Sequence, residues 1–305
     1  ENLMANIMLA RVYYSKSRRL AKGPARDQAM ELVMQNYLHA IEIGSDEAMY
    51  TLGTLYLNAY FGKESTLSGL PLLRQATDLD NTNAMIHLAQ LYFQGLHVLQ
   101  DFDESEKYFL RAASLDADAA KIDYARFLMN PTVKKEFNAR AYDWLKDLAK
   151  NGTHCQQGEK GCVVAEAKIL IGNLHATGTH VNRSYRRAHS WFKSAVTSSF
   201  DDPGIVNEVA WTLTVTNLAR LRDERYALKI MDRVMNQNTS ARETPAYLDT
   251  WAATYAANGQ HERAIKIQKE ALDKAVADRA TDILQVLQEH LDLFEAGQTI
   301  VDPIP

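Results

Sequence analysis

The two cysteines are the residues best suited to covalent or metal chemistry, and they lie close together in the segment Cys155-Gln-Gln-Gly-Glu-Lys-Gly-Cys162. Because the segment is polar and contains two glycines, a disulfide between Cys155 and Cys162 is geometrically easy. Cysteines confined to one such segment favour an oxidising compartment, such as the periplasm or the cell exterior. Two alternatives stay open. One is a metal site using His154, Cys155 and Cys162, which lacks a second pair of ligands at metal-binding spacing, and the other is two reduced thiols.

The histidines do not form a recognisable metal or catalytic pattern. His175 and His180 are separated by five positions, which does not place both on one helix face as an i, i+4 metal pair requires. We therefore expect His175 to be a packed core residue. His290 stands beside Glu289 and near Asp292, and this pattern predicts a solvated helix face.

Motifs and charge also exclude several functions. The sequence contains no G-x-G-x-x-G, G-x-x-x-x-G-K-[ST], G-x-S-x-G or H-E-x-x-H pattern. Its 34 basic and 38 acidic residues give a net charge of -4 without a basic block, so nucleic acid is not an expected partner. No apolar run approaches the ~18 residues of a membrane-spanning helix. We expect no enzymatic activity, no cofactor and no metal, and because the chain begins at Glu1, we expect a leader or further domain to have been removed.

An internal repeat organises the chain. A large apolar residue, a small residue and, three positions later, an aromatic or apolar residue recur seven times. The small residues are Ala10, Gly53, Ala89, Ala125, Gly172, Ala210 and Ala252. Their spacings of 43, 36, 36, 47, 38 and 42 residues indicate a repeat of about 36 residues with insertions.

A second set of residues follows the small residue at fixed offsets in the middle copies. Nineteen positions after it stand Leu72, Tyr108, Trp144 and Trp191, and 23 positions after it stand Ala76, Ala112, Leu148 and Ala195. A four-residue step places such pairs on one helix face, so each repeat is predicted to be two antiparallel helices. The small residue would let the helices approach, and the residue 19 positions later would fill the space opposite.

The predicted fold is all-α, a right-handed α-α superhelical solenoid of about seven helix-hairpin repeats with a C-terminal capping helix, because single hairpins cannot bury their apolar faces alone. The helix pairs are expected over residues 2–43, 46–78, 82–115, 117–150, 163–198, 203–237 and 244–275. The capping helix is expected over 278–296, and the tail 300–305 as a disordered end or a link. The alternative is a helical bundle with chance periodicity.

Two repeats resemble the Sel1-like repeat. One has Gly172, Gly178, Val181, Ala188, Trp191 and Ala195 at its key positions, and the other has Leu88, Ala89, Tyr92, Gly95, Val98, Asp101, Phe109, Ala112 and Ala113. The last repeat runs from Ala252 to Ala264 and Ala271 and is similar to a tetratricopeptide repeat, although Gln268 stands where a large apolar residue is usual. We therefore expect a degenerate helical pair over 1–45, Sel1-like repeats with the Cys155–Cys162 insertion over 46–200, tetratricopeptide-like repeats over 201–277, and a capping helix and tail over 278–305.

The resemblance implies an interaction scaffold. Proteins with such repeats typically organise complexes, and many are bacterial and exported, some of them in envelope or exopolysaccharide machinery. The expected function is thus a non-enzymatic protein–protein interaction scaffold of a periplasmic or secreted bacterial complex. A cytoplasmic location is the alternative.

The concave face of the predicted solenoid is the expected partner-binding surface. It is lined by the first helix of each hairpin, mainly at positions one and five after the small residue. The expected binding residues are Tyr50, Thr54, Asn58, Gln90, Phe93, Gln94, Arg126, Asn130, Asn173 and Thr177. Apart from Arg126, the residues at positions one and five carry uncharged hydrogen-bonding groups, which suit an extended protein or peptide partner, or the hydroxyls of a sugar chain in polysaccharide export or cell-wall assembly. Tyr50 and Phe93 could add apolar contact or stacking. The same side chains could instead be solvated or bridge neighbouring repeats.

Overall fold

The chain folds into α-helices arranged in two compact units. A computed structural model describes residues 3–152, 162–199 and 201–304, and these contain fifteen α-helices and two short 3-10 helices. Unit 1 is Glu1–Phe127 and unit 2 is Leu128–Pro305. Within the described ranges, no helix combines the length and the apolar composition of a membrane-spanning segment.

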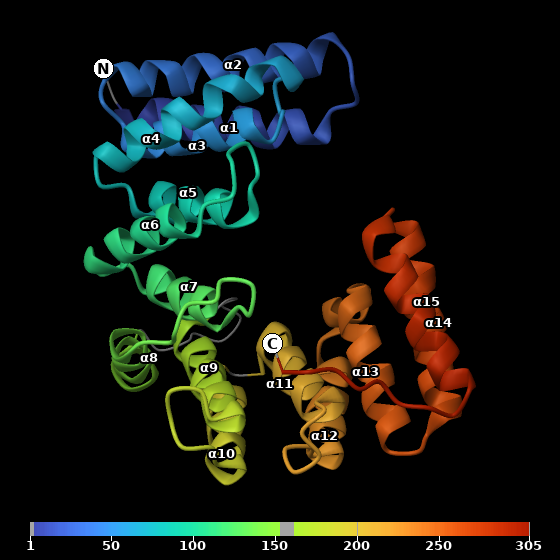
Figure 1. The fold of residues 1–305 in the computed structure, drawn as a ribbon. Helices are drawn as coiled ribbons and strands as arrows, with labels where there is room; N and C mark the ends of the chain where they lie inside the picture. Colours follow the sequence, from blue (N-terminus) through green and yellow to red (C-terminus); the bar gives the residue numbers. More distant parts are fainter. Residues whose placement is uncertain (1–2, 153–161, 200, 305) are drawn as a thin grey trace. The chain divides into compact units, whose positions relative to one another are not determined.

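Unit 1 consists of stacked helical hairpins (Figure 1). Its helices are α1 (Leu3–Arg19), α2 (Pro24–Glu42), α3 (Asp46–Leu57), α4 (Gly69–Asp78), α5 (Thr82–Gln94), α6 (Phe102–Ser114) and most of α7 (Asp118–Met129), with the 3-10 helix η1 (Lys63–Ser68) before α4. The pairs α1–α2, α3–α4 and α5–α6 pack along their lengths, and successive pairs meet through α2–α3 and α4–α5 contacts.

Unit 2 repeats the arrangement. Its helices are α8 (Ala139–Asn151), α9 (Val163–Thr177), α10 (Tyr185–Ser198), α11 (Pro203–Val215), α12 (Glu224–Gln237), α13 (Pro245–Ala257), α14 (His261–Ala277) and α15 (Thr281–Glu295), with the 3-10 helix η2 (Thr239–Glu243) before α13. The pairs are α9–α10, α11–α12 and α13–α14, while α8 packs on α9 and α15 packs on α14. The prediction of an all-α repeat of helical hairpins is therefore confirmed.

Side-chain caps fix where many of these helices begin. The carboxylate of Asp202 accepts a hydrogen bond from the backbone N–H of Gly204 at 2.7 Å, and Asn81 caps α5 through Ala84 in the same way. Because the first N–H groups of a helix have no partner within it, such caps stabilise the start of a helix. Further capping side chains are those of Ser45, Asp101, Asn138, Ser184 and Asp223.

The two helices of a hairpin approach closely at the small residue of the repeat. A Cβ atom on Gly172 would lie 2.5 Å from Cε1 of Phe192, so only glycine fits there. From the sequence we expected Trp191 to fill the space opposite Gly172. That expectation is wrong, because the space is filled by the next residue, Phe192, 20 positions after the small residue. The residues at this offset in the middle repeats are at most 3% exposed: Leu73, Phe109, Leu145 and Phe192. The residues 20 and 23 positions after the small residue are three positions apart, so they share one helix face. The residue 19 positions after the small residue is therefore turned toward the edge of the contact between the two helices.

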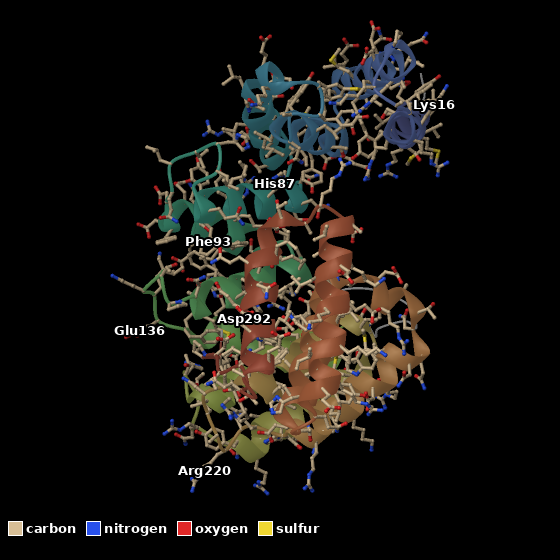
Figure 2. The ribbon with its side chains drawn as sticks, turned by 90° about the vertical axis from the view of Figure 1, so that its right-hand side faces the viewer. Lys16, His87, Phe93, Glu136, Arg220 and Asp292 are labelled. Atoms are coloured by element: carbon tan, nitrogen blue, oxygen red, sulfur yellow. The ribbon has the colours of Figure 1, made fainter. Side chains whose placement is uncertain are left out.

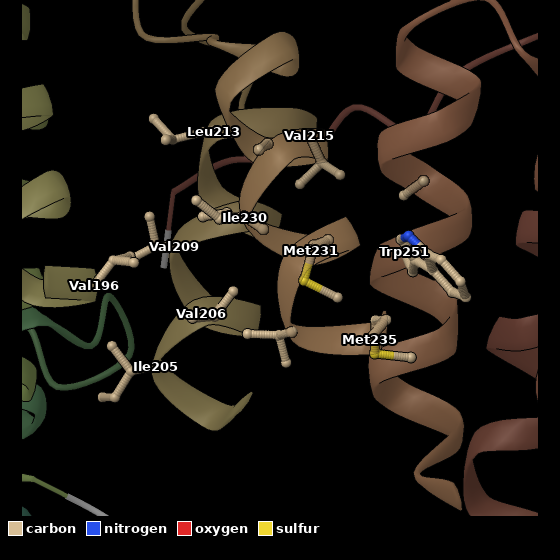
Figure 3. Close-up of a cluster of buried hydrophobic side chains, with 14 of the residues drawn as sticks. Val196, Ile205, Val206, Val209, Leu213, Val215, Ile230, Met231, Met235 and Trp251 are labelled. Carbon is tan, nitrogen blue, oxygen red and sulfur yellow. The ribbon is translucent and has the colours of Figure 1, made fainter. Parts of the chain in front are cut away.

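The largest continuous core lies in unit 2. Figure 3 shows Val209 and Leu213 of α11 beside Ile230 and Met231 of α12, with Trp251 of α13 closing the cluster. All five side chains are at most 9% exposed. Burial of this kind contributes about 1.5 to 3 kcal/mol per large aliphatic side chain, so the α11–α13 contacts bind neighbouring hairpins together.

The C-terminal tail packs back onto unit 2. The N–H of Asp302 donates to the carbonyl of Val215 at 2.8 Å, and the N–H of Asn217 donates to the carbonyl of Asp302 at 2.8 Å. These bonds form an isolated parallel β-bridge between Thr216 and Asp302, and Ile300 is 6% exposed. The expectation of a disordered tail is therefore wrong for the described residues up to 304, because the tail satisfies backbone groups at the end of α11.

The contact between Gly172 and Phe192 yields a test of hairpin packing. Gly172→Ala should lower the free energy of unfolding by about 1 to 3 kcal/mol, because the added methyl group overpacks the α9–α10 crossing. In a Phe192→Leu background the same substitution should cost less, since the clashing ring atoms are gone. Urea unfolding of the four proteins measures this coupling, and equal costs in both backgrounds would contradict the close approach.

Candidate functional site

In unit 1, two of the predicted binding residues join neighbouring hairpins. Thr54 Oγ1 donates to the carbonyl of Tyr50 at 2.9 Å and lies 3.2 Å from His87 Nδ1, while Gln90 Nε2 donates to Asp123 Oδ2 at 3.4 Å. Both contacts link the residue after the small position of one repeat to the residue two before the small position of the next. Thr54 and Gln90 therefore bridge neighbouring repeats, which is an alternative that the sequence left open.

The groups between α3, α5 and α7 are partly desolvated. Burial lowers the pKa of His87, and the charge of His97 lowers it further. Burial raises the pKa of Asp123, against the opposing effect of the positive charge on Arg126. The ring of Tyr50 meets the His87 ring edge-on, with centroids 6.2 Å apart. Together these contacts join α3, α5 and α7 through partly buried side chains.

Phe93, a predicted binding residue, packs against other aromatic rings within unit 1. Its ring lies 5.9 Å from that of Phe102 and 6.0 Å from that of Phe127, measured between centroids, so it joins α5 to α6 and α7. Figure 2 labels Phe93. Asn58 and Gln94, at the C-terminal ends of α3 and α5, are exposed. Of the predicted set in unit 1, the exposed residues are Asn58, Gln90, Gln94 and Arg126, and Gln90 is also bonded to Asp123.

Unit 2 contains a cavity of about 770 Å³ beside the tail, called here the tail cavity. It is formed by the end of α7 with the connection to α8, the end of α9 with the connection to α10, and the tail. Its lining residues are Leu128, Met129, Pro131, Lys135, Glu136, Phe137, Thr177, Thr179, His180, Pro303 and Ile304. The predicted residue Thr177 is among them. The predicted residue Asn130 lies between two of them, and its Oδ1 accepts from the N–H and the hydroxyl of Thr132, which holds the connection in a turn.

One wall of the tail cavity is aromatic. The ring of His180 lies 5.8 Å from that of Phe137 and 5.4 Å from that of Tyr142. His180 has φ of +62° and follows Gly178, which has φ of +81°, so a left-handed turn presents the imidazole at the rim. Glu136 is exposed on the α7–α8 connection, where Figure 2 labels it. The tail cavity thus combines apolar walls with polar groups at its edge, as peptide and small-molecule sites do.

Asn173, another predicted binding residue, is buried. It is 4% exposed, and its Oδ1 atom has no hydrogen-bond partner within the described structure. His175, two positions along α9, is 5% exposed with Nδ1 3.4 Å from the carbonyl of Asn182, as expected for a packed core histidine. As placed, Asn173 contributes to the interior of unit 2 and not to its accessible surface.

A buried polar cluster joins α13, α14 and α15, and the sequence did not indicate it. Asp249 Oδ1 accepts from Gln268 Nε2 at 2.7 Å and lies 2.8 Å from His290 Nδ1, and Gln268 Nε2 also donates to the carbonyl of Leu287 at 2.9 Å. The three side chains are at most 9% exposed. The expectation of a solvated His290 is therefore wrong, because its imidazole completes a buried network. The only signal was Gln268 at a usually apolar position.

The predicted cysteine bridge is not tested by the structure. Cys155 and His154 lie outside the described residues, and Cys162 precedes α9 and is 4% exposed. Among the residues that are described, no three His, Cys, Asp or Glu side chains are grouped to hold a metal ion. The disulfide between Cys155 and Cys162 stays a prediction.

Comparison with known proteins agrees with this architecture. The Sel1 repeat family matches residues 82–116 and 165–199. The crystal structure of a Sel1 repeat protein from Oxalobacter formigenes is similar with a TM-score of 0.59 and 16% identity, over 87% of this chain and 98% of that one. A second similar structure is a protective antigen present in uropathogenic Escherichia coli strains, described as displaying an SLR fold. Its TM-score is 0.56 at 16% identity, over 94% of this chain and 56% of that one.

No curated protein matches the sequence significantly. At 16% identity the two structural likenesses show the fold alone. The family match is more specific, because its two segments coincide with the α5–α6 and α9–α10 hairpins, where the sequence resemblance was found. The chain therefore contains two segments that match the Sel1 repeat family, residues 82–116 and 165–199.

Proposed function

We propose that this chain is a protein-interaction scaffold, and that the tail cavity holds an extended segment of a partner protein. The observation that carries the proposal is the path of the chain's own tail. Asp302 pairs with the backbone on both sides of Thr216 in the manner of an added strand. Pro303 and Ile304 then continue along the cavity as one of its walls. This part of unit 2 therefore already accommodates an extended peptide.

The chemistry of the tail cavity suits such a segment. Leu128, Met129 and Phe137 offer apolar contacts for one or two side chains, and the ring of His180 can stack on or hydrogen-bond to a ligand at the rim. Main-chain pairing supplies affinity that depends little on sequence, while a pocket for a side chain supplies specificity. The accessible Asn58, Gln94 and Arg126 of unit 1 are proposed as further contacts to the partner.

The test uses a matched pair of threonines. Thr177 and Thr197 are both exposed, and each donates its hydroxyl to the carbonyl four residues earlier, at 3.0 and 2.8 Å. Only Thr177 lines the tail cavity. Peptides selected from a random display library on the 1–305 chain should bind with about micromolar affinity. Thr177→Arg should weaken them at least ~10-fold, a loss of about 1.4 kcal/mol, because the long side chain fills the cavity, whereas Thr197→Arg should not.

Fluorescence anisotropy of the labelled peptides measures both variants, and circular dichroism checks that each folds. Failure to enrich any peptide would contradict the proposal. Equal binding by the Thr177→Arg protein and the wild type would do so as well, because the peptide would then bind elsewhere.

We further propose that the scaffold acts in the bacterial envelope or outside the cell. Two observations support this location. One is the paired cysteines in a polar insertion, which favour an oxidising compartment. The other is the similar E. coli structure, which is described as a protective antigen.

Thiol alkylation tests this location. In protein isolated from its native host, Cys155 and Cys162 should resist alkylation until a reductant is added, because they form an intramolecular disulfide. Intact mass before and after reduction reports the number of alkyl groups. Immediate alkylation of both cysteines would point to a reducing compartment and to a cytoplasmic scaffold.

A further inference from the structure

Unit 1 contains a pocket of about 410 Å³ between its first two hairpins, called here the α2 pocket. One wall is α2, and the other is formed by the end of α3 and by the connection that leads through η1 to α4. The two walls belong to neighbouring hairpins that pack on each other through α2 and α3. A pocket of this size is large enough for a small ligand or for a side chain of a partner.

The wall from α2 combines apolar and acidic side chains. Asp27, Met30, Glu31 and Met34 line the pocket at the spacing i, i+3, i+4, i+7, so they lie on one face of the helix. The two methionines are half-buried and the two carboxylates are exposed. This face therefore offers a flexible apolar surface with negative charge at its rim.

The opposite wall is aromatic. The rings of Tyr56 and Phe61 meet edge-on with centroids 5.4 Å apart, and the ring of Phe61 meets that of Tyr60 in the same way at 4.9 Å. Burial raises the pKa of Tyr56, so its phenol is neutral at physiological pH. A wall of neutral aromatic rings contacts the stem of a long side chain and attracts a cation through the electron-rich ring faces.

The charges of the α2 pocket are of one sign. Asp27 and Glu31 are its charged lining residues, and both are acidic. Among the residues described in α1, α2 and α3, the ion pairs join Arg11 to Glu47 and His39 to Glu42, and neither pair neutralises the pocket carboxylates. Two like charges four positions apart on a helix repel each other. A cation placed between them would relieve this repulsion.

We propose that the α2 pocket binds the basic side chain of a partner protein, a lysine or an arginine. Its methylene stem contacts Met30, Met34 and Phe61, and its charged head lies between the carboxylates of Asp27 and Glu31. Long basic side chains bury the stem and keep the head near water, which matches an apolar floor with an acidic, exposed rim. An anionic group would be repelled by the same rim. This site lies on unit 1 and does not depend on the tail cavity.

Nuclear magnetic resonance of the full chain tests the proposal with N-acetyl-lysine methylamide as the probe. The chain is labelled with carbon-13 in the methionine methyl groups, and each signal is assigned by replacing its methionine with leucine. The signals of Met30 and Met34 should shift saturably, with a dissociation constant in the millimolar range that is usual for one side chain. Met4 and Met8, which are exposed on α1, are internal controls and should not shift.

A neutral probe isolates the contribution of charge. N-acetyl-norleucine methylamide has the same stem without the ammonium group, and it should bind at least ~5-fold more weakly, because it loses the attraction of the carboxylates and of the aromatic wall. In the Asp27→Asn, Glu31→Gln double variant the difference between the two probes should shrink, because the carboxylates that distinguish them are gone.

A matched pair of glutamates provides the variants. Glu31 accepts from Gln35 Nε2 at 3.2 Å, and Glu289 of α15 accepts from Gln285 Nε2 at 2.9 Å, also across four positions. Both are exposed, and only Glu31 lines the α2 pocket. Glu31→Gln should weaken the lysine probe at least ~3-fold. Glu289→Gln removes the same charge and should bind the probe as the wild type does.

Circular dichroism checks that each variant is folded, which is expected because both glutamates are exposed. The absence of a saturable shift of Met30 and Met34 up to ~100 mM of the lysine probe would overturn the proposal. Equal binding of the neutral probe would do so as well, because the pocket would then select for the apolar stem alone. Binding that is unchanged by Glu31→Gln would place the probe elsewhere.

Discussion

The stacking of one hairpin on the next is the interaction on which this structure depends. A single pair of helices has apolar residues on two sides, and it can bury only one of them within itself. The other side must meet a neighbour, and residues such as Leu52, Leu88 and Val209 are fully buried at that contact. Because equivalent repeat positions are buried in α3, α5, α7, α9, α11 and α13, neighbouring hairpins pack on each other in a similar way along the chain. The small residue of the repeat sets how closely the two helices of a hairpin approach.

This constraint also decides where function can reside. Side chains between neighbouring first helices are drawn into the stack, as the bridges from Thr54 to His87 and from Gln90 to Asp123 illustrate. Polar groups used in this way are not available to a partner. Binding capacity is left at the ends of the first helices and in the connections that follow them. The tail cavity is of this kind.

The sequence predicted the hairpins well because their spacing is encoded by residues with one geometric role. The expected pairs 46–78, 82–115 and 163–198 agree with α3–α4, α5–α6 and α9–α10 within one or two residues at each end. The residue opposite the small position was misplaced by one, because Trp191 is larger and more conspicuous than its buried neighbour Phe192, and periodicity alone does not fix helix rotation. The Sel1 repeat resemblance was confirmed for the two best copies.

The tail cavity and the buried cluster could not be predicted in the same way. Both arise where segments distant in sequence meet, such as the tail with the end of α11, or Asp249 with His290. A repeat pattern describes contacts at a fixed sequence separation, and these contacts have none. Of the expected concave-face residues, Thr177 lines the cavity and Asn130 shapes it, while Asn173 is buried for a reason that its repeat position does not reveal.

The most direct test of the stacking account is a series of identical substitutions at one repeat position. Leu9, Leu52 and Leu88 all stand one residue before the small position, and they are 45%, 0% and 0% exposed. In urea unfolding, Leu52→Ala and Leu88→Ala should each cost about 2 to 5 kcal/mol, whereas Leu9→Ala should change stability by no more than about 0.5 kcal/mol. Equal costs at all three positions would show that burial against the preceding hairpin is not what holds the repeats together.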